Sequence, residues 1–503
     1  MNFGRRNMFN LQSGITLKLS NDQSINNKFN DILVVGNGFD LFLGHKTKYS
    51  DFFYFISLYR ILYLIKDSYK YPIGTFSTFF PSGYRSKNQK LFGIIDIVDT
   101  YLEIYCDEDD QRYKKLNEAI NSTFFKWLLT KIFADKYSFL FEEIENKIEL
   151  DINKAYFDNL SDNLYKLIIK YQKEIESSLV KAEDSCNGWT DIEQLIEYLV
   201  LGSDNLKCKF ESIKNIPSNQ EYLRDFPNKA NSYYDSLQKF CDEFSLFLKA
   251  EIESHKQSES SKYMNGGEDF SAVASDINSD YIKSLKYRSN GLISNISFLE
   301  LKCILDFNYT KSTDKLIDLC ASRPCCESNY HKPYVYHING EIDCNNLIFG
   351  YGRDKAISVS KECFCFEKFT QRIIKNTQFV DFKNLLADKF NVLIFGHSCS
   401  LADRDVIHKL LSSDNLGIAV IFCHDIPALI SISNNLLEIL GQDRMETLLD
   451  YSEYNKLNNK ISSSLPTKIE KGESNNISCL NSFHSVLFFC VESKNDKFLQ
   501  NKY

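Results

Sequence analysis

The chain alternates between short apolar runs, which are typical of buried strands, and longer segments in which apolar residues recur at helical spacing. Strand-like runs lie at 31–35, 303–307, 334–338, 346–349, 392–395 and 417–422. Helical segments that separate several of these runs lie at 312–321, 375–388, 403–411 and 427–440. Because strands that alternate with helices form parallel sheets covered by helices, the pattern predicts an α/β fold.

Strand signals almost vanish between about 91 and 254, where the apolar spacing is helical, and a polar stretch near 258–280 is typical of a linker. We therefore expect one Rossmann-like α/β domain with a parallel sheet, interrupted by a large all-α insertion. The expected parts are a flexible N-terminal arm (1–30), the first part of the α/β domain (31–90), the helical insertion (91–290), the second part of the α/β domain (291–450), and a polar segment with a C-terminal strand (451–503).

Composition excludes several classes of protein. The 503 residues carry a formal charge of −8, so no domain-wide basic field indicates binding to nucleic acid. The 15 cysteines include no CxxC pair, which disfavours structural zinc, and aromatic residues make up 14% of the chain, which we attribute to core packing. No signal peptide and no apolar run of transmembrane length is present in the sequence, so we expect a cytoplasmic protein without membrane contact.

Four short motifs follow apolar runs: GNGFD at 36–40, FNYT at 307–310, HING at 337–340 and GHS at 396–398. Parallel α/β sheets bind ligands outside the carboxyl ends of their strands, so these motifs are expected to converge on one crevice. The first motif resembles a nucleotide-binding turn, because closely spaced glycines let the backbone approach a phosphate.

Each motif also has a plain structural interpretation. The glycines at 36 and 38 suit any tight turn, and Leu41 stands where a dehydrogenase fingerprint requires its third glycine, which disfavours hydride transfer. Asp40 suits either the first turn of a helix or a hydrogen bond to a ribose hydroxyl. Asn308 suits either a helix cap or a ribose-binding role, and His337 either a structural or a catalytic one.

The order of these motifs, together with GYG at 350–352 and LIFGHSxSxxDxD near 393–405, resembles the AbiH family of bacteriophage abortive-infection proteins. The chain is also similar, more distantly, to the SIR2-like NAD-binding fold. That resemblance implies that Asn308 is the pocket asparagine and His337 the catalytic histidine. The chain lacks the paired CxxC motifs of sirtuin deacetylases, which argues against deacetylation. It also departs from AbiH-like sequences at His45 and Lys46, where Leu and Pro are common, and we place no function on His45.

The chemistry agrees with this resemblance. Cleavage of the nicotinamide–ribose bond of NAD needs no metal, because the leaving group is already cationic, and an imidazole is suited to take the proton from the attacking water. An asparagine can both donate to and accept from a ribose hydroxyl and water. The expected catalytic residues are therefore His337 and Asn308, without a metal, and the expected NAD-binding residues are Gly36, Asn37, Gly38, Phe39, Asp40, Thr310, Gly340, Gly396, His397 and Ser398.

The sequence thus predicts an antiphage effector that binds NAD and hydrolyses it to nicotinamide and ADP-ribose. Two alternatives stay open: a sensor that binds NAD or ADP-ribose without turning it over, and a nuclease effector. The expected partners are an NAD-like nucleotide, a phage-derived trigger or partner defence protein, and further copies of the chain in a homo-oligomer. The helical insertion would sense the trigger or mediate assembly.

Overall fold

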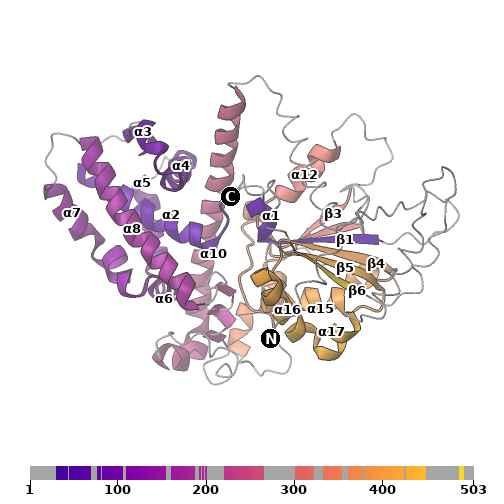
Figure 1. Ribbon diagram of the computed structural model, residues 1–503. Coiled ribbons are helices and arrows are strands. Elements are labelled where there is room, and N and C mark those ends of the chain that lie inside the picture. Colours follow the sequence, from indigo (N-terminus) through magenta and orange to yellow (C-terminus); the bar gives the residue numbers. More distant parts are fainter. Residues whose placement is uncertain are drawn as a thin grey trace, which may run out of the picture. The chain divides into compact units, whose positions relative to one another are not determined.

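The computed structural model of the chain (Figure 1) forms two compact units. It describes residues 30–42, 45–69, 76–80, 82–105, 109–154, 160–186, 192–193, 195–197, 199–200, 220–264, 301–321, 332–353, 359, 361–377, 380–423, 426–448 and 486–491. The α/β unit comprises Met1–Gly44, Gly266–Gly340 and Thr377–Tyr503, and the helical unit comprises His45–Asn265 and Glu341–Asn376. The predicted arm, linker and polar C-terminal segment lie outside the described residues, with two exceptions. Asn30 of the arm begins a strand, and residues 258–264 of the predicted linker are helical.

The α/β unit contains a parallel sheet of six strands, which confirms the predicted fold class. The strands are β1 (Asn30–Val35), β2 (Cys303–Asp306), β3 (Tyr334–His337), β4 (Phe390–Phe395), β5 (Leu416–Cys423) and β6 (Val486–Val491). Their order across the sheet is β3-β2-β1-β4-β5-β6, which is the doubly wound order. The strand order therefore reverses between β1 and β4. The C-terminal strand predicted from the sequence is β6, at one edge of the sheet.

The central strands are apolar runs because both faces of the sheet are covered. Ile32, Leu33, Val34 and Val35 of β1 are completely buried. Helix α12 (Ser312–Ala321) lies on one side of the sheet, and α15 (Arg404–Leu411), α16 (Ile426–Leu440) and α17 (Gln442–Leu448) lie on the other (Figure 1). The short helices of this unit are α1 (Asn37–Phe42), α14 (Phe382–Leu385) and η9 (Leu401–Asp403).

The helical unit is built from long helices around a core of aromatic side chains. Phe52 lies in contact with the rings of Phe125, Phe240, Phe244 and Phe247, with ring centroids 5.2–6.2 Å apart. The high aromatic content therefore serves core packing, as predicted. Among the described helices, none combines the length and apolarity needed to cross a membrane.

The helices given by the described residues of this unit are α2 (Tyr49–Tyr69), α3 (Ser82–Arg85), α4 (Gln89–Ile104), α5 (Asp109–Ile120), α6 (Thr123–Phe133), α7 (Ile144–Lys154), α8 (Leu160–Cys186), α10 (Gln220–Met264) and α13 (Lys368–Ile374), with the shorter η1 (Phe76–Phe79), η3 (Ala134–Lys136), η4 (Ser138–Glu142), η7 (Ile342–Cys344) and η8 (Lys361–Phe366).

The boundaries of the units differ from those expected from the sequence. The helical unit begins at His45, not near residue 91, because the aromatic face of α2 packs against α10. It also includes Glu341–Asn376, a segment that the sequence analysis assigned to the α/β domain. The chain thus enters the helical unit twice, once after α1 and once after β3.

Two predicted elements are wrong. The apolar run 346–349 is not a strand, because Leu347, Ile348 and Phe349 are buried within the helical unit, where Phe349 packs against Phe240 and Phe244. Of the helix predicted at 375–388, the described residues form only the short helix α14 (Phe382–Leu385). Helix α13 ends at Ile374, and Asn376 follows in the left-handed conformation with a φ of 49°, which ends the helical path.

Candidate functional site

The register of the sheet brings the four sequence motifs to one edge. Val35 is paired with Asp306 on one side and with Phe395 on the other, and Asp306 is paired in turn with His337. The GNGFD, FNYT and GHS segments begin directly after Val35, Asp306 and Phe395, and the HING segment begins at His337 itself. All four motifs therefore lie at the carboxyl ends of β1–β4, as predicted, and within the α/β unit.

The first and last motifs meet where the strand order reverses. The Gly38 N–H donates to the Gly396 carbonyl at 2.9 Å, and the Gly36 N–H donates to the Phe395 carbonyl at 3.1 Å. A Cβ atom on Gly38 would lie 2.5 Å from the Gly396 Cα, and Gly396 has a φ of +64°. These glycines are therefore required by the close approach of two turns, and the N–H groups of Gly36 and Gly38 are bonded to protein carbonyls.

Asp40 and Thr310 connect the first motif to the second. The Thr310 hydroxyl lies 2.9 Å from Oδ1 and 2.8 Å from Oδ2 of Asp40, and both residues are almost completely buried. A hydroxyl that donates to a buried carboxylate stabilises its charge. The two predicted ligand-binding residues thus bond to each other and fix the position of the FNYT turn.

His337 lies between two carboxylates. Its Nε2 donates to Asp314 Oδ2 at 2.8 Å, and its Nδ1 lies 3.9 Å from Asp306 Oδ2. Burial raises the pKa of Asp306 to about 7, although His337 and the bonded Thr313 hydroxyl act in the opposite direction. Burial also opposes ionisation of Asp314. The hydrogen bond from His337 and the electrostatic interaction with the His337 ring outweigh burial, so the pKa of Asp314 is lowered. His337 is thereby held in one orientation, which is what a general base needs.

Asn308 is the unusual residue of this edge. It is 3% exposed, and neither its Nδ2 nor its Oδ1 has a hydrogen-bond partner among the described residues. The neighbouring Asn339 donates through Nδ2 to the Phe307 carbonyl at 3.2 Å. Its Oδ1 accepts no hydrogen bond from any described residue. Leaving buried amide groups unpaired costs roughly 1–3 kcal/mol each, so a partner supplied by a ligand would be stabilising.

The GHS turn is built around His397. Its Nδ1 accepts from the Cys399 N–H at 3.0 Å, which leaves the proton on Nε2, 3.3 Å from Asp403 Oδ2. The ring packs against Phe307, with the ring centroids 4.3 Å apart, so this turn also touches the FNYT motif. Ser398 is exposed. His397 therefore shapes the turn, and Ser398 is the side chain of this motif that faces solvent.

The remaining predicted residues differ in exposure. Asn37 is exposed, whereas Phe39 is buried with its ring edge toward Phe395 at a centroid distance of 6.4 Å. Gly340 is buried and has a φ of +82°, a conformation that favours glycine. Phe39 and Gly340 thus support the turns, and Asn37 is available to solvent.

A family model described as "Bacteriophage abortive infection AbiH" matches residues 32–424, which is most of the chain. The chain belongs to this family. No curated protein and no solved structure matches it. Membership connects the chain with abortive infection, a form of defence against phage. The matched range includes all four motifs at the carboxyl edge of the sheet.

Three residues at this edge of the AbiH chain were not identified from sequence: Asp306, Asp314 and Asn339. The sequence does show an acidic residue, Asp306, within the apolar run that begins at Cys303. A carboxylate in a buried strand needs compensating hydrogen bonds, so this position could have been identified as special. Asn339 was visible inside HING. The contact between Asp314 and His337 carries no sequence signal, because it depends on how α12 packs.

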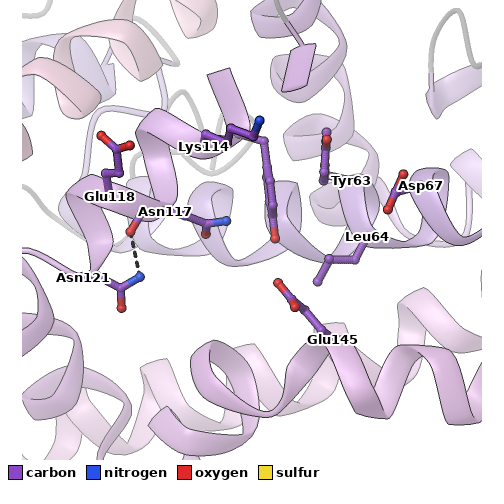
Figure 2. Close-up of a pocket in the computed structure, with 9 residues that line it drawn as sticks. Tyr63, Leu64, Asp67, Lys114, Asn117, Glu118, Asn121 and Glu145 are labelled. Atoms are coloured by element: carbon purple, nitrogen blue, oxygen red, sulfur yellow. Dashed lines mark hydrogen bonds between the residues drawn. The ribbon is translucent and has the colours of Figure 1, made fainter. Parts of the chain in front are cut away.

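The helical unit of the AbiH chain contains a separate recess of about 620 Å³, and no predicted site residue lines it (Figure 2). The rings of Tyr63 and Tyr113 stack beside it with their centroids 3.8 Å apart. Its charged lining comprises three carboxylates and one lysine, namely Asp67, Glu118, Glu145 and Lys114. The recess is therefore negatively charged overall and suits a cationic group better than an NAD phosphate.

Proposed function

We propose that the carboxyl edge of the sheet binds NAD or a closely related nucleotide and hydrolyses it to nicotinamide and ADP-ribose. The observation that carries this proposal is the buried amide of Asn308, whose two polar atoms have no partner among the described residues. A ribose offers hydroxyl groups that donate and accept, which is what an amide with a free oxygen and a free nitrogen requires.

The position of Asn308 supports a nucleotide. Doubly wound sheets bind nucleotides outside the carboxyl ends of the strands, at the point where the strand order reverses. In this chain the reversal lies between β1 and β4, and Asn308 follows β2, the next strand along. The resemblance to SIR2-like proteins favours the same pocket and assigns the ribose contact to the same asparagine.

The reaction requires few protein groups. The bond between C1′ of the ribose and the nicotinamide nitrogen breaks, and its electron pair returns to the pyridine ring. A water oxygen forms the new bond to C1′ and releases one proton. His337, oriented by Asp314 at 2.8 Å, accepts that proton, and Asn308 holds the ribose and the water. Neutralisation of Asp306 limits the negative charge beside the histidine.

Loss of NAD would stop phage replication together with host metabolism, which fits an abortive-infection protein. Such an enzyme must be restrained before infection. We assign this restraint to the helical unit, to the oligomeric state or to a partner protein, and a phage-derived trigger would relieve it. The proposal includes a cytoplasmic location, where the protein would meet both NAD and the replicating phage.

The test is incubation of the purified chain with NAD, with and without extract from phage-infected cells. Nicotinamide release is followed by liquid chromatography, and binding by calorimetry. His337→Ala should retain binding and lose turnover by about 10²–10⁴-fold, the usual range for a general base. Asn308→Ala should weaken binding by about fivefold and lower turnover as well, because one hydrogen bond contributes about 1 kcal/mol.

The control is Asn391→Ala. Asn391 lies on β4 near its amino end, away from the motifs, and its Nδ2 donates to Asp31 at 2.9 Å. This variant should keep full binding and turnover. Because the Asn308 amide has no partner among the described residues, Asn308→Ala should also keep its thermal stability, so its loss of activity reports on the ligand.

Binding without nicotinamide release under both conditions would refute hydrolysis and favour the sensor. Absence of both would refute the nucleotide site, and degradation of nucleic acid by the same samples would then favour the nuclease.

A further inference from the structure

Two histidines and a glutamate converge inside the helical unit. His45 Nδ1 lies 3.1 Å from Glu251 Oε2, and one ligand atom from each of His45, Glu251 and His255 lies within 4.8 Å of the others. The two histidine rings are 4.6 Å apart between centroids. Both histidines therefore lie beside the same carboxylate.

The local structure accounts for this convergence. Glu251 and His255 are four residues apart on α10, which places them on the same face of the helix. His45 comes from the segment before α2, and its bond to Glu251 spans 206 residues of the chain. Glu251 is 2% exposed, whereas both histidines are partly accessible. The cluster is thus anchored on a buried carboxylate and open at the histidine side.

Glu251 is prepared to act as an anion. Its Oε1 accepts from the Lys46 N–H at 2.8 Å, which orients the carboxylate and leaves Oε2 toward the histidines. A fixed anion with a held second oxygen is the usual form of a metal-binding carboxylate.

We propose that His45, Glu251 and His255 form a binding site for a divalent transition-metal ion, with zinc as the best match. Two imidazoles with one carboxylate are a recurrent zinc donor set, and water completes the tetrahedron. Donor atoms about 2.0–2.1 Å from zinc are about 3.4 Å apart in a tetrahedron, close to the 3.1 Å between His45 and Glu251. Rotation of the His255 side chain brings in the third donor.

The ion would join two distant segments of the helical unit. The three donor atoms come together only when the segment of His45 packs against α10. The ion therefore binds the folded unit and not the unfolded chain, and binding stabilises the folded unit. This role is separate from the proposed hydrolysis of NAD, which needs no metal, and it does not rest on it.

The experiment measures metal binding by the full chain after dialysis against a chelator. Calorimetry with Zn²⁺ should show one site per chain, and zinc should raise the unfolding temperature. Co²⁺ provides the spectroscopic test, because the chain has 15 cysteines that also bind metal. A site of nitrogen and oxygen donors gives visible d–d bands without the near-ultraviolet charge-transfer absorption of cobalt–thiolate bonds.

Variants identify the ligands. His45→Ala and His255→Ala should each weaken zinc binding by roughly tenfold or more and remove the cobalt bands. His408→Ala changes an exposed histidine on α15 and should leave both unchanged. Circular dichroism checks the fold, and the partly exposed His255 provides the decisive variant if His45→Ala does not fold.

Absence of zinc binding by the wild-type chain would overturn the proposal. Equal zinc affinity in the wild type and His255→Ala, or a cobalt spectrum dominated by thiolate absorption, would do so as well.

Discussion

Replacement of Gly396 by alanine should destabilise the α/β unit more than the same replacement at Gly441. Both glycines belong to that unit and both have left-handed backbones, with φ values of +64° and +78°. They differ in their surroundings. A Cβ atom on Gly396 would lie 2.6 Å from the Gly38 carbonyl carbon and 2.6 Å from the Phe39 nitrogen, whereas a Cβ atom on Gly441 has nothing within 4 Å.

Comparison of the two alanine variants separates the cost of a left-handed backbone from the cost of steric overlap. A left-handed alanine costs about 1–2 kcal/mol, offset in part by about 0.4–1 kcal/mol from the less flexible unfolded chain. Gly441→Ala should therefore lower the free energy of unfolding by about 1 kcal/mol. Gly396→Ala carries the same cost plus an overlap with rigid backbone, and overpacking costs about 1–3 kcal/mol. The expected total at Gly396 is about 2–4 kcal/mol.

Hydrogen exchange of the β1 and β4 amides, measured by mass spectrometry, provides the assay, because exchange through opening reports the stability of the strands themselves. Trp127 lies on α6 of the helical unit, so the urea unfolding of that unit, followed by tryptophan fluorescence, is an internal control that should not change. If the β1 and β4 amides exchange equally fast in the two alanine variants, the contact between the glycine turns makes no energetic contribution. Our interpretation of these glycines is then refuted.

Two further outcomes are expected. Because burial raises the pKa of Asp306 from 3.8 to about 7, the folded chain holds a proton there that the unfolded chain releases. Stability should therefore fall as the pH rises from about 4 to 7, and Asp306→Asn should reduce this slope in urea titrations; an unchanged slope would contradict the assignment. Lys368→Met leaves the buried Glu193 without its 2.6 Å ion pair and should cost about 3–5 kcal/mol in urea unfolding. Lys332→Met removes an exposed pair with Asp318 and should cost below about 1 kcal/mol; equal losses would refute the effect of burial.

The sequence predicted the strands that are buried on both faces. The runs at 31–35, 303–307 and 392–395 became β1, β2 and β4, because such runs fit a sheet covered by helices. The run at 346–349 has the same composition but packs as a loop against α10. Apolar composition predicts burial, and only long-range pairing distinguishes a strand from a buried loop.

For the candidate site, the sequence predicted the location and not the bonds. The motifs converge because the carboxyl ends of parallel strands are aligned, a rule that needs no knowledge of distant contacts. The bond from Gly38 to Gly396 requires β1 and β4 to be neighbours, and the bond from His337 to Asp314 requires the packing of α12. Sequence reasoning therefore assigned Gly38 to a ligand and did not identify Asp314.

The central position of β1 has a consequence for synthesis on the ribosome. Among the described strands β1 is made first, yet its neighbours are β2 and β4, and about 350 residues separate it from β4. At roughly 5–20 residues per second, this strand waits about 20–70 s for its second partner. During that time its apolar side chains have no β4 to pack beside. Chains released before β4 is made cannot assemble the carboxyl edge, so a ligand of that edge requires a chain that already extends through β4.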